Sequence, residues 1–269
     1  MNLTQEGYFL GPLLFRWGGL LIIFGVAAGL LLAAHEAKKN NYDVGIISDL
    51  FLPLIIWGTI GARLWHILTP PLSSAQLGLT TQYYLSHPVD ILSLWIGGFG
   101  IAGAWIGGIV ALYFFARANE NNFWELADLL APGLALAQAI GRMGNYFNQE
   151  LYGLPANLPW KIFIEPAYRL VGFETVETYH PLFAYEVMLN FATMVFLLWF
   201  ARRFVNNLKA GDLFLAYIGL YSFFRLFLEF LRLDVAFING ININQVFFSL
   251  TLFCAGIGSF LRHRIPQKL

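Results

Sequence analysis

The chain has 269 residues, of which 58% are hydrophobic and only 12% are charged, and its mean hydropathy is +0.63. Soluble domains carry about 25% charged residues, so this composition excludes a soluble enzyme or nucleic-acid-binding protein and is typical of an integral membrane protein. The formal net charge of +0 argues neither for nor against a charged partner, and the single cysteine, Cys254, excludes an intramolecular disulfide.

Seven segments are apolar enough to cross a membrane as helices, for which roughly 20 mostly apolar residues are needed. They cover residues 13–34, 46–68, 94–115, 123–141, 183–204, 212–231 and 243–262. Asp128 and Pro132 interrupt the fourth segment. We therefore expect an all-α integral membrane protein with seven transmembrane helices, in which residues 1–269 form a single domain.

The connection between the fourth and fifth segments, residues 150–182, is too polar to cross a membrane. Its stretch NLPWKIFIEPAYRLVGFETVETYHP alternates well enough for a short strand or two. We expect these residues to form a small head between helices 4 and 5, outside the membrane.

Lysines and arginines predict the orientation, because cytoplasmic loops are enriched in them. One side of the membrane receives Lys38, Lys39, Arg117, Arg202, Arg203, Lys209, Arg262, Arg264 and Lys268. The opposite side receives only Lys161 and Arg169, both in the long connection. We therefore expect an N-terminus outside the cell membrane, a cytoplasmic C-terminus and an extracytoplasmic head.

Three groups of polar residues interrupt the apolar segments. A charge at the middle of a membrane costs about 2.5–3.5 kcal/mol by insertion scales, so such residues are functional candidates. The first group lies in AIGRMGNYFNQELYG, and the second in YSFFRLFLEFLRLD. The third is GARLWHIL. Their polar members are Arg142, Asn145, Asn148, Gln149 and Glu150; Tyr221, Arg225, Glu229 and Arg232; and Arg63 and His66.

The second group places Arg225, Glu229 and Arg232 on one face of a helix, at spacings i, i+4 and i+7. Arg225 and Glu229 could be a buried ion pair that only neutralises itself. That explanation leaves Arg232 and Arg142 without a carboxylate, although Glu150 could pair with one of them. Several arginines together favour a phosphate ligand, because a guanidinium group binds phosphate oxygens with two parallel hydrogen bonds. In an apolar chamber the phosphate of a phospholipid is the expected ligand.

A glycine-rich stretch, IGGFGIAGAWIGG, matches the GxGxxG pattern at Gly98, Gly100 and Gly103. No strand precedes it, so we reject a dinucleotide site. Gly103 and Gly107 have the GxxxG spacing of closely packed helices. Alternatively, the part that begins at Gly97 is a broken helix whose free N–H groups face a bound anion.

The histidines show no metal-ligand spacing, so we expect no metal site. His180, in YHPLFAYE, precedes the fifth segment and lies near Tyr185 and Glu186. It is either a hydrogen-bonded residue at the membrane surface or a participant in the chemistry.

At these residues the sequence resembles the prolipoprotein diacylglyceryl transferases, bacterial inner-membrane enzymes that begin lipoprotein maturation. GRMGNYFNQELYG resembles the family signature. Further stretches look like family segments and occur in the family's order: GPLLFRWGGL, GARLWHIL, LWIGGFGIAGAWIGG, HPLFAYE and LFLAYIGLYSFFRLFLEFLR. The resemblance covers nearly the whole chain, and it implies a multi-pass protein of the bacterial cytoplasmic membrane with a small outer head.

The resemblance also implies a reaction. The sn-1,2-diacylglyceryl group of phosphatidylglycerol moves to the lipobox cysteine thiol of a prolipoprotein signal peptide, forming a thioether and releasing glycerol 1-phosphate. No metal or soluble cofactor is expected, and a monomer would suffice. We expect catalytic roles for Arg142, Arg225, Glu150 and His180. We expect substrate contacts from Arg142, Asn145, Gly153, Tyr221, Glu229, Arg232, Arg63 and Gly98.

Two positions depart from the family pattern. Ala102 stands where many members have a histidine that is often proposed as the base, and Gly18 stands where the family has a tyrosine. The substrate thiol, with a pKa of about 8.5, must then be activated by the arginines or lose its proton to Glu150, His66 or His180. A non-catalytic relative that binds phospholipid or precursor is the alternative. A channel or transporter predicts internal repeats, and none is evident.

Overall fold

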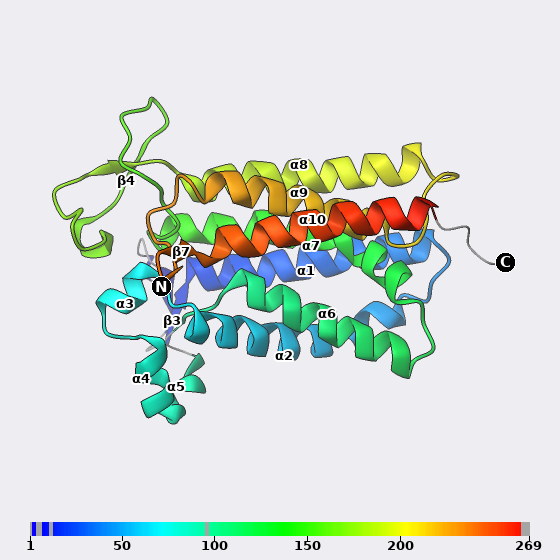
Figure 1. Cartoon of the computed structure of the whole chain (residues 1–269), viewed down its shortest axis with the longest axis horizontal. Coiled ribbons are helices and arrows are strands. Elements are labelled where there is room, and N and C mark those ends of the chain that lie inside the picture. The colour runs from blue at the N-terminus through cyan, green and yellow to red at the C-terminus, as the bar shows by residue number, and fades with distance from the viewer. Residues whose placement is uncertain (1, 4–6, 11–12, 95–96, 265–269) are drawn as a thin grey trace.

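The structure, a computed structural model, describes residues 2–3, 7–10, 13–94 and 97–264. Long helices lie side by side in one bundle, with short helices and strands gathered at one end (Figure 1). Six helices of the described chain are long and apolar enough to cross a membrane: α1 (Trp17–Lys39), α2 (Gly45–Leu68), α6 (Ile101–Ala118), α7 (Phe123–Phe147), α8 (Leu182–Arg203) and α10 (Ile243–Arg264). The expectation of a mainly helical membrane protein is confirmed.

Several helix boundaries differ from the expected segments. Residues Leu13–Arg16 form strand β3, which pairs antiparallel with β2 (Gly7–Leu10), so α1 begins only at Trp17. β2 also pairs with β1 (Asn2–Leu3). α6 begins at Ile101 rather than at residue 94, and the expected start of that segment includes residues 95–96, which are not described.

α7 continues to Phe147, beyond the expected end at residue 141, so Arg142 and Asn145 lie within the helix. α9 (Asp212–Leu228) has 17 residues and ends before Arg232. Arg232 instead pairs with Gly153 in an isolated antiparallel bridge. The prediction that Arg232 lies on the same helix as Arg225 is therefore wrong, whereas Tyr221 and Arg225 do lie on α9.

Glycines allow the helices to pack closely. A Cβ atom at Gly103 would lie 2.0 Å from the carbonyl oxygen of Gly61, and one at Gly107 would lie 2.0 Å from that of Trp57. No larger residue fits at either position while the backbones keep this separation, and the interpretation of Gly103 and Gly107 as packing residues is confirmed. α7 lies at the centre of the bundle and packs against α1, α8 and α9.

The small elements lie at the end of the bundle that contains residues 150–182, named the head end below (Figure 1). They are α3 (Leu72–Gln76), α4 (Thr81–Ser86), α5 (Pro88–Ile91), β4 (Ile162–Phe163), the 3-10 helix η2 (Pro166–Tyr168), β5 (Thr178–Tyr179), β6 (Phe237–Ile238) and β7 (Ile241–Asn242). β4 and β5 lie in the stretch where the alternating pattern predicted a short strand or two, and they pair antiparallel.

Residues 150–182 have a small core of their own, formed by Tyr152, Ile164, Leu170 and Tyr179. Burial raises the pKa of Tyr152 to about 12, so its hydroxyl stays protonated and donates to the carbonyl oxygen of Tyr168 at 2.8 Å. This core holds the segment in place next to the helix ends.

Candidate active site at the head end

Charged side chains from α7, α8 and α9 form a continuous chain of ion pairs near the head end. Glu186 on α8 contacts Arg142 on α7 and Arg225 on α9, each at 2.6 Å. Glu229, directly after α9, contacts Arg225 at 3.0 Å and Arg232 at 3.7 Å. The two predicted groups around Arg142 and Arg225 therefore meet in one site.

The burial of these side chains shows which of them a ligand can reach. The carboxylates of Glu186 and Glu229 are 2% and 0% exposed, and the side chain of Arg225 is 3% exposed. Arg142 and Arg232 are 22% and 19% exposed. Three guanidinium groups face two carboxylates, so the chain of ion pairs keeps one excess positive charge. An anion that contacts Arg142 and Arg232 would complete the charge balance.

Glu186 is the residue that the sequence analysis missed. The sequence did contain a signal for it, because Glu186 is a carboxylate inside the apolar segment 183–204, and such residues are functional candidates. Glu150, which could pair with one of the arginines, forms none of these ion pairs, although its charge interacts electrostatically with Arg142. One of its oxygens accepts hydrogen bonds from the side chains of Asn145 and Asn148, both at 2.8 Å. These three residues form a hydrogen-bonded group at the C-terminal end of α7, the helix that carries Arg142.

The unusual glycine at position 18 has a packing explanation. A Cβ atom at Gly18 would lie 2.5 Å from the amide oxygen of Asn148, and one at Gly144 would lie 2.9 Å from Gly18 itself. α1 and α7 therefore approach too closely for a tyrosine at this position. Asn148, which bonds Glu150, occupies the space next to the Gly18 backbone.

Gly153 connects the head to the site through its backbone. Its N–H donates to the carbonyl oxygen of His180 at 2.9 Å, and a Cβ atom there would lie 2.1 Å from Leu182. Because Gly153 also pairs with Arg232, it fixes the chain that carries one of the three arginines.

Aromatic and polar side chains continue the site toward the middle of the bundle. Tyr221 and Tyr217 lie one and two helical turns before Arg225, and both rings contact Trp105 of α6, at centroid distances of 4.7 and 5.7 Å. Tyr217 also lies beside Gln138 of α7. Both hydroxyls are buried, and that of Tyr221 lies beside Arg142. Neither hydroxyl forms a hydrogen bond of good geometry with another residue that the structure describes.

Arg63 and Gly98 lie together in a separate cluster. Arg63 is 3% exposed and donates to four backbone carbonyls, those of Asp90 (2.7 Å), Ile91 (3.1 Å), Gly97 (2.5 Å) and Gly98 (3.3 Å). Its guanidinium group thus holds the segment that precedes α6. The stretch from Gly97 to Gly100 is not helical, and its carbonyls face a cation of the protein itself.

The histidines do not join the arginines through their side chains. His66 is buried beside Gly98 and contacts the ring of Tyr84 edge-on, at a centroid distance of 6.2 Å. The Nδ1 atom of His180 lies 3.2 Å from the hydroxyl of Tyr185, which accepts a hydrogen bond from Trp160 at 2.8 Å. Trp160 and Tyr185 also line a surface cavity of about 590 Å³.

Within the described part of the chain, no group of three or more histidine, cysteine, aspartate or glutamate side chains could hold a metal ion. The chain of ion pairs instead contains three arginines and two glutamates. This arrangement suits a phosphate-containing ligand, whose oxygens accept the strong hydrogen bonds that guanidinium groups donate.

Comparison with known proteins gives a consistent result. The family model described as "Prolipoprotein diacylglyceryl transferase" matches residues 7–262. A protein of Trichormus variabilis named phosphatidylglycerol–prolipoprotein diacylglyceryl transferase is 38% identical over 253 residues, which cover 92% of this chain and 86% of the relative. Proteins of the same name in Synechococcus elongatus and Parasynechococcus marenigrum are 38% and 36% identical, over 88% and 96% of this chain and 80% and 94% of the relatives.

Proposed function

The chain belongs to the prolipoprotein diacylglyceryl transferase family, and from this premise we propose how its own residues hold the lipid and carry out the transfer. It is a membrane transferase that moves the diacylglyceryl group of phosphatidylglycerol to prolipoproteins. The observation that carries the proposal is the excess positive charge of the ion-pair chain at the head end. Arg142 and Arg232, the two partly exposed arginines, bind the lipid phosphate, and Arg225 supports them from the interior.

The arginines also promote bond breaking. The lipobox thiolate attacks the glyceryl carbon that carries the phosphate, a C–S bond forms, and the C–O bond to the phosphate breaks. The electron pair of that bond stays on the phosphate, which leaves as part of glycerol 1-phosphate with a second negative charge. Fixed positive groups that face such a developing charge usually give the largest contribution to catalysis. Asn145, one turn after Arg142, orients Glu150 and the phosphate at this end of α7.

Glu150 takes the proton of the substrate thiol. Its second carboxylate oxygen accepts no hydrogen bond from the described residues, whereas the first is held by Asn145 and Asn148. The carboxylate lies close enough to Arg142 to interact electrostatically with it. Ala102 is buried in the first turn of α6 and offers no proton acceptor. His180, held by Tyr185, binds the peptide substrate next to the thiol instead of ionising it.

Tyr221 and Tyr217 bind the part of the lipid that is transferred. In a phospholipid the two ester carbonyls follow the phosphate on the hydrocarbon side, and the two tyrosines follow Arg225 toward the middle of the bundle. Arg142, which lies beside the Tyr221 hydroxyl, can only donate, so the hydroxyl proton of Tyr221 still lacks an acceptor among the described residues. A buried donor without an acceptor costs about 1–3 kcal/mol. Ester carbonyls accept hydrogen bonds, so binding of the diacylglyceryl group would recover this energy.

The other residues expected to contact the substrate, Arg63, Gly98 and Gly153, position the backbone around the site instead. Arg63 holds Gly97 and Gly98 before α6, the helix that carries Trp105, and Gly153 fixes Arg232. The site is complete within one chain, which supports a monomer as the active unit.

We also assign the membrane arrangement. α9, with 17 residues, is at the lower limit of length for a spanning helix, and it would be the seventh span. Lys39, Arg117, Arg203 and Arg264 are at or near the ends of four helices, α1, α6, α8 and α10, that all run away from the head end (Figure 1). By the positive-inside rule the head end faces outward from the bacterial cytoplasmic membrane, and the C-terminus is cytoplasmic. Lys268, part of the same expectation, lies outside the described residues.

The test is a transfer assay with phosphatidylglycerol and a lipobox peptide, followed by mass spectrometry. We expect addition of a diacylglyceryl group, reduced roughly 100-fold or more in Arg142→Ala and Arg225→Ala. Arg117→Ala, which removes an exposed arginine at the opposite end, should keep full activity. Folded protein that binds the lipid but never modifies the peptide, beside a working transferase, would instead identify a non-catalytic relative.

A further inference from the structure

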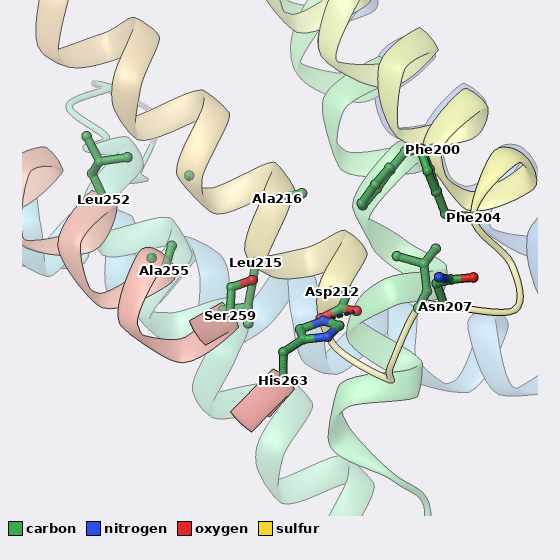
Figure 2. Close-up of a pocket in the computed structure, with 13 residues that line it drawn as sticks. Phe200, Phe204, Asn207, Asp212, Leu215, Ala216, Leu252, Ala255, Ser259 and His263 are labelled. Carbon is green, nitrogen blue, oxygen red and sulfur yellow. Dashed lines mark hydrogen bonds and ion pairs between the residues drawn. The ribbon is translucent and has the colours of Figure 1, made fainter. Parts of the chain in front are cut away.

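A second cavity lies at the opposite end of the bundle from the arginines. It has a volume of about 380 Å³ and opens between α8 and α10, with α9 as its floor (Figure 2). Most of its wall is apolar and comes from Phe200 and Phe204, Leu215 and Ala216, and Leu252, Ala255 and Gly256. Because most of this wall is apolar, an acyl chain of a membrane lipid can occupy the cavity without leaving an apolar environment.

The cavity is polar at one end only. Asp212, at the start of α9, points toward His263 of α10 there, and Asn207 lies close by (Figure 2). One oxygen of Asp212 contacts the Nε2 atom of His263 at 2.9 Å and accepts from the backbone N–H of Lys209 at 2.7 Å. The other oxygen is buried and accepts no hydrogen bond from any described residue. An apolar groove that ends in a hydrogen-bond acceptor is complementary to a phospholipid. The groove suits an acyl chain, and the acceptor suits a hydrogen-bond donor in the headgroup.

A positive charge lies beside Phe204, one of the residues that line the cavity. Arg203 is the last residue of α8, is exposed, and lies over the ring of Phe204 at 5.6 Å from its centroid. Among the described residues it has no carboxylate partner. Phe204 lines the cavity, so a phosphate at this side of the opening would be within the field of Arg203. The site would then offer a cation for the phosphate and a carboxylate for a headgroup donor.

We propose that this cavity is a binding site for a second phospholipid of the phosphatidylethanolamine type, separate from the reaction site. One acyl chain occupies the groove between α8 and α10, the phosphate binds Arg203, and the headgroup ammonium donates to the free oxygen of Asp212. The inference does not depend on the roles proposed for the arginines at the head end.

The experiment compares phosphatidylethanolamine with phosphatidylcholine, which has the same phosphate but no hydrogen-bond donor in its headgroup. The purified full chain is titrated with each lipid, with equal acyl chains, and retained lipid is counted by native mass spectrometry. We expect about tenfold tighter binding of phosphatidylethanolamine, the difference that one charge-assisted hydrogen bond provides. Asp212→Asn should remove this preference, and Arg203→Gln should weaken both lipids.

A groove-filling variant tests the acyl-chain part. A Cβ atom at Gly256 meets nothing within 4 Å, so Gly256→Leu extends into the groove without displacing other atoms. It should lose the bound lipid, while transfer activity, measured separately, stays unchanged. Gly19→Leu on α1, where a Cβ atom also meets nothing within 4 Å, is the matched control and should retain the lipid. Equal binding of the two lipids, unchanged binding in Gly256→Leu, or a groove occupied by a second copy of the chain would overturn the proposal.

Discussion

The carboxylate of Glu186 lies 2.6 Å from the guanidinium group of Arg142, which belongs to the neighbouring helix α7. The other oxygen of the same carboxylate lies 2.6 Å from Arg225 on α9. One buried glutamate therefore sets the separation of two arginines from two further helices. Because its side chain is only 2% exposed, water cannot replace it as a partner.

Replacing this carboxylate should damage both stability and activity. In Glu186→Gln the buried Arg225 keeps its charge but loses one of two carboxylates, and breaking a buried ion pair costs about 3–5 kcal/mol. We expect a loss of that size in unfolding measurements on detergent-solubilised protein, together with reduced transfer. Glu177→Gln, at an exposed position in the head, is the control. Equal stability of the two variants would show that Glu186 does not organise the arginines.

The local part of this site was predictable from the sequence, and the long-range part was not. Arg225 and Glu229 are four residues apart in an apolar segment, and helical periodicity alone brings them together. Glu186 joins them through the packing of α8 against α7 and α9, which no local pattern specifies. The apolar segments likewise indicated the long helices, but their ends depend on other contacts. Arg63, for example, binds the carbonyls of Gly97 and Gly98 and thereby keeps that stretch non-helical before α6.

The proposed proton acceptor can be tested through pH. Glu150→Gln keeps the hydrogen bonds to Asn145 and Asn148 possible but removes the base, so transfer at neutral pH should fall by about 10²–10⁴-fold. Above a pH of about 8.5 the substrate thiol ionises without help. The loss in this variant should therefore shrink as the pH rises, and initial rates measured between neutral and alkaline pH will show it.

His180→Gln provides the comparison for this experiment. If His180 binds the peptide through the group that includes Tyr185 and Trp160, its replacement should raise KM and leave the shape of the pH profile unchanged. Alkaline rescue of His180→Gln, with none for Glu150→Gln, would reverse the two assignments.

Arg63 should respond differently from the arginines of the ion-pair chain. Its guanidinium group donates to four carbonyls at once, a geometry that the single ammonium of Arg63→Lys cannot reproduce. We expect a lower unfolding temperature and faster proteolysis of residues 90–98, while the remaining folded protein transfers lipid at nearly the normal rate. A variant with normal stability and abolished transfer would place Arg63 in direct contact with the substrate.

The two buried tyrosines allow a test with a modified lipid. If Tyr221 and Tyr217 donate to ester carbonyls, the wild-type protein should prefer diester over diether phosphatidylglycerol, because the ether lipid lacks both carbonyls. Each phenylalanine variant removes one donor, so kcat/KM for the diester should fall by about tenfold, while kcat/KM for the diether stays the same. Tyr113→Phe, at an exposed position on α6, should leave both values unchanged. Equal losses for the two lipids would mean that the tyrosine hydroxyls support the arginines rather than bind the diacylglyceryl group.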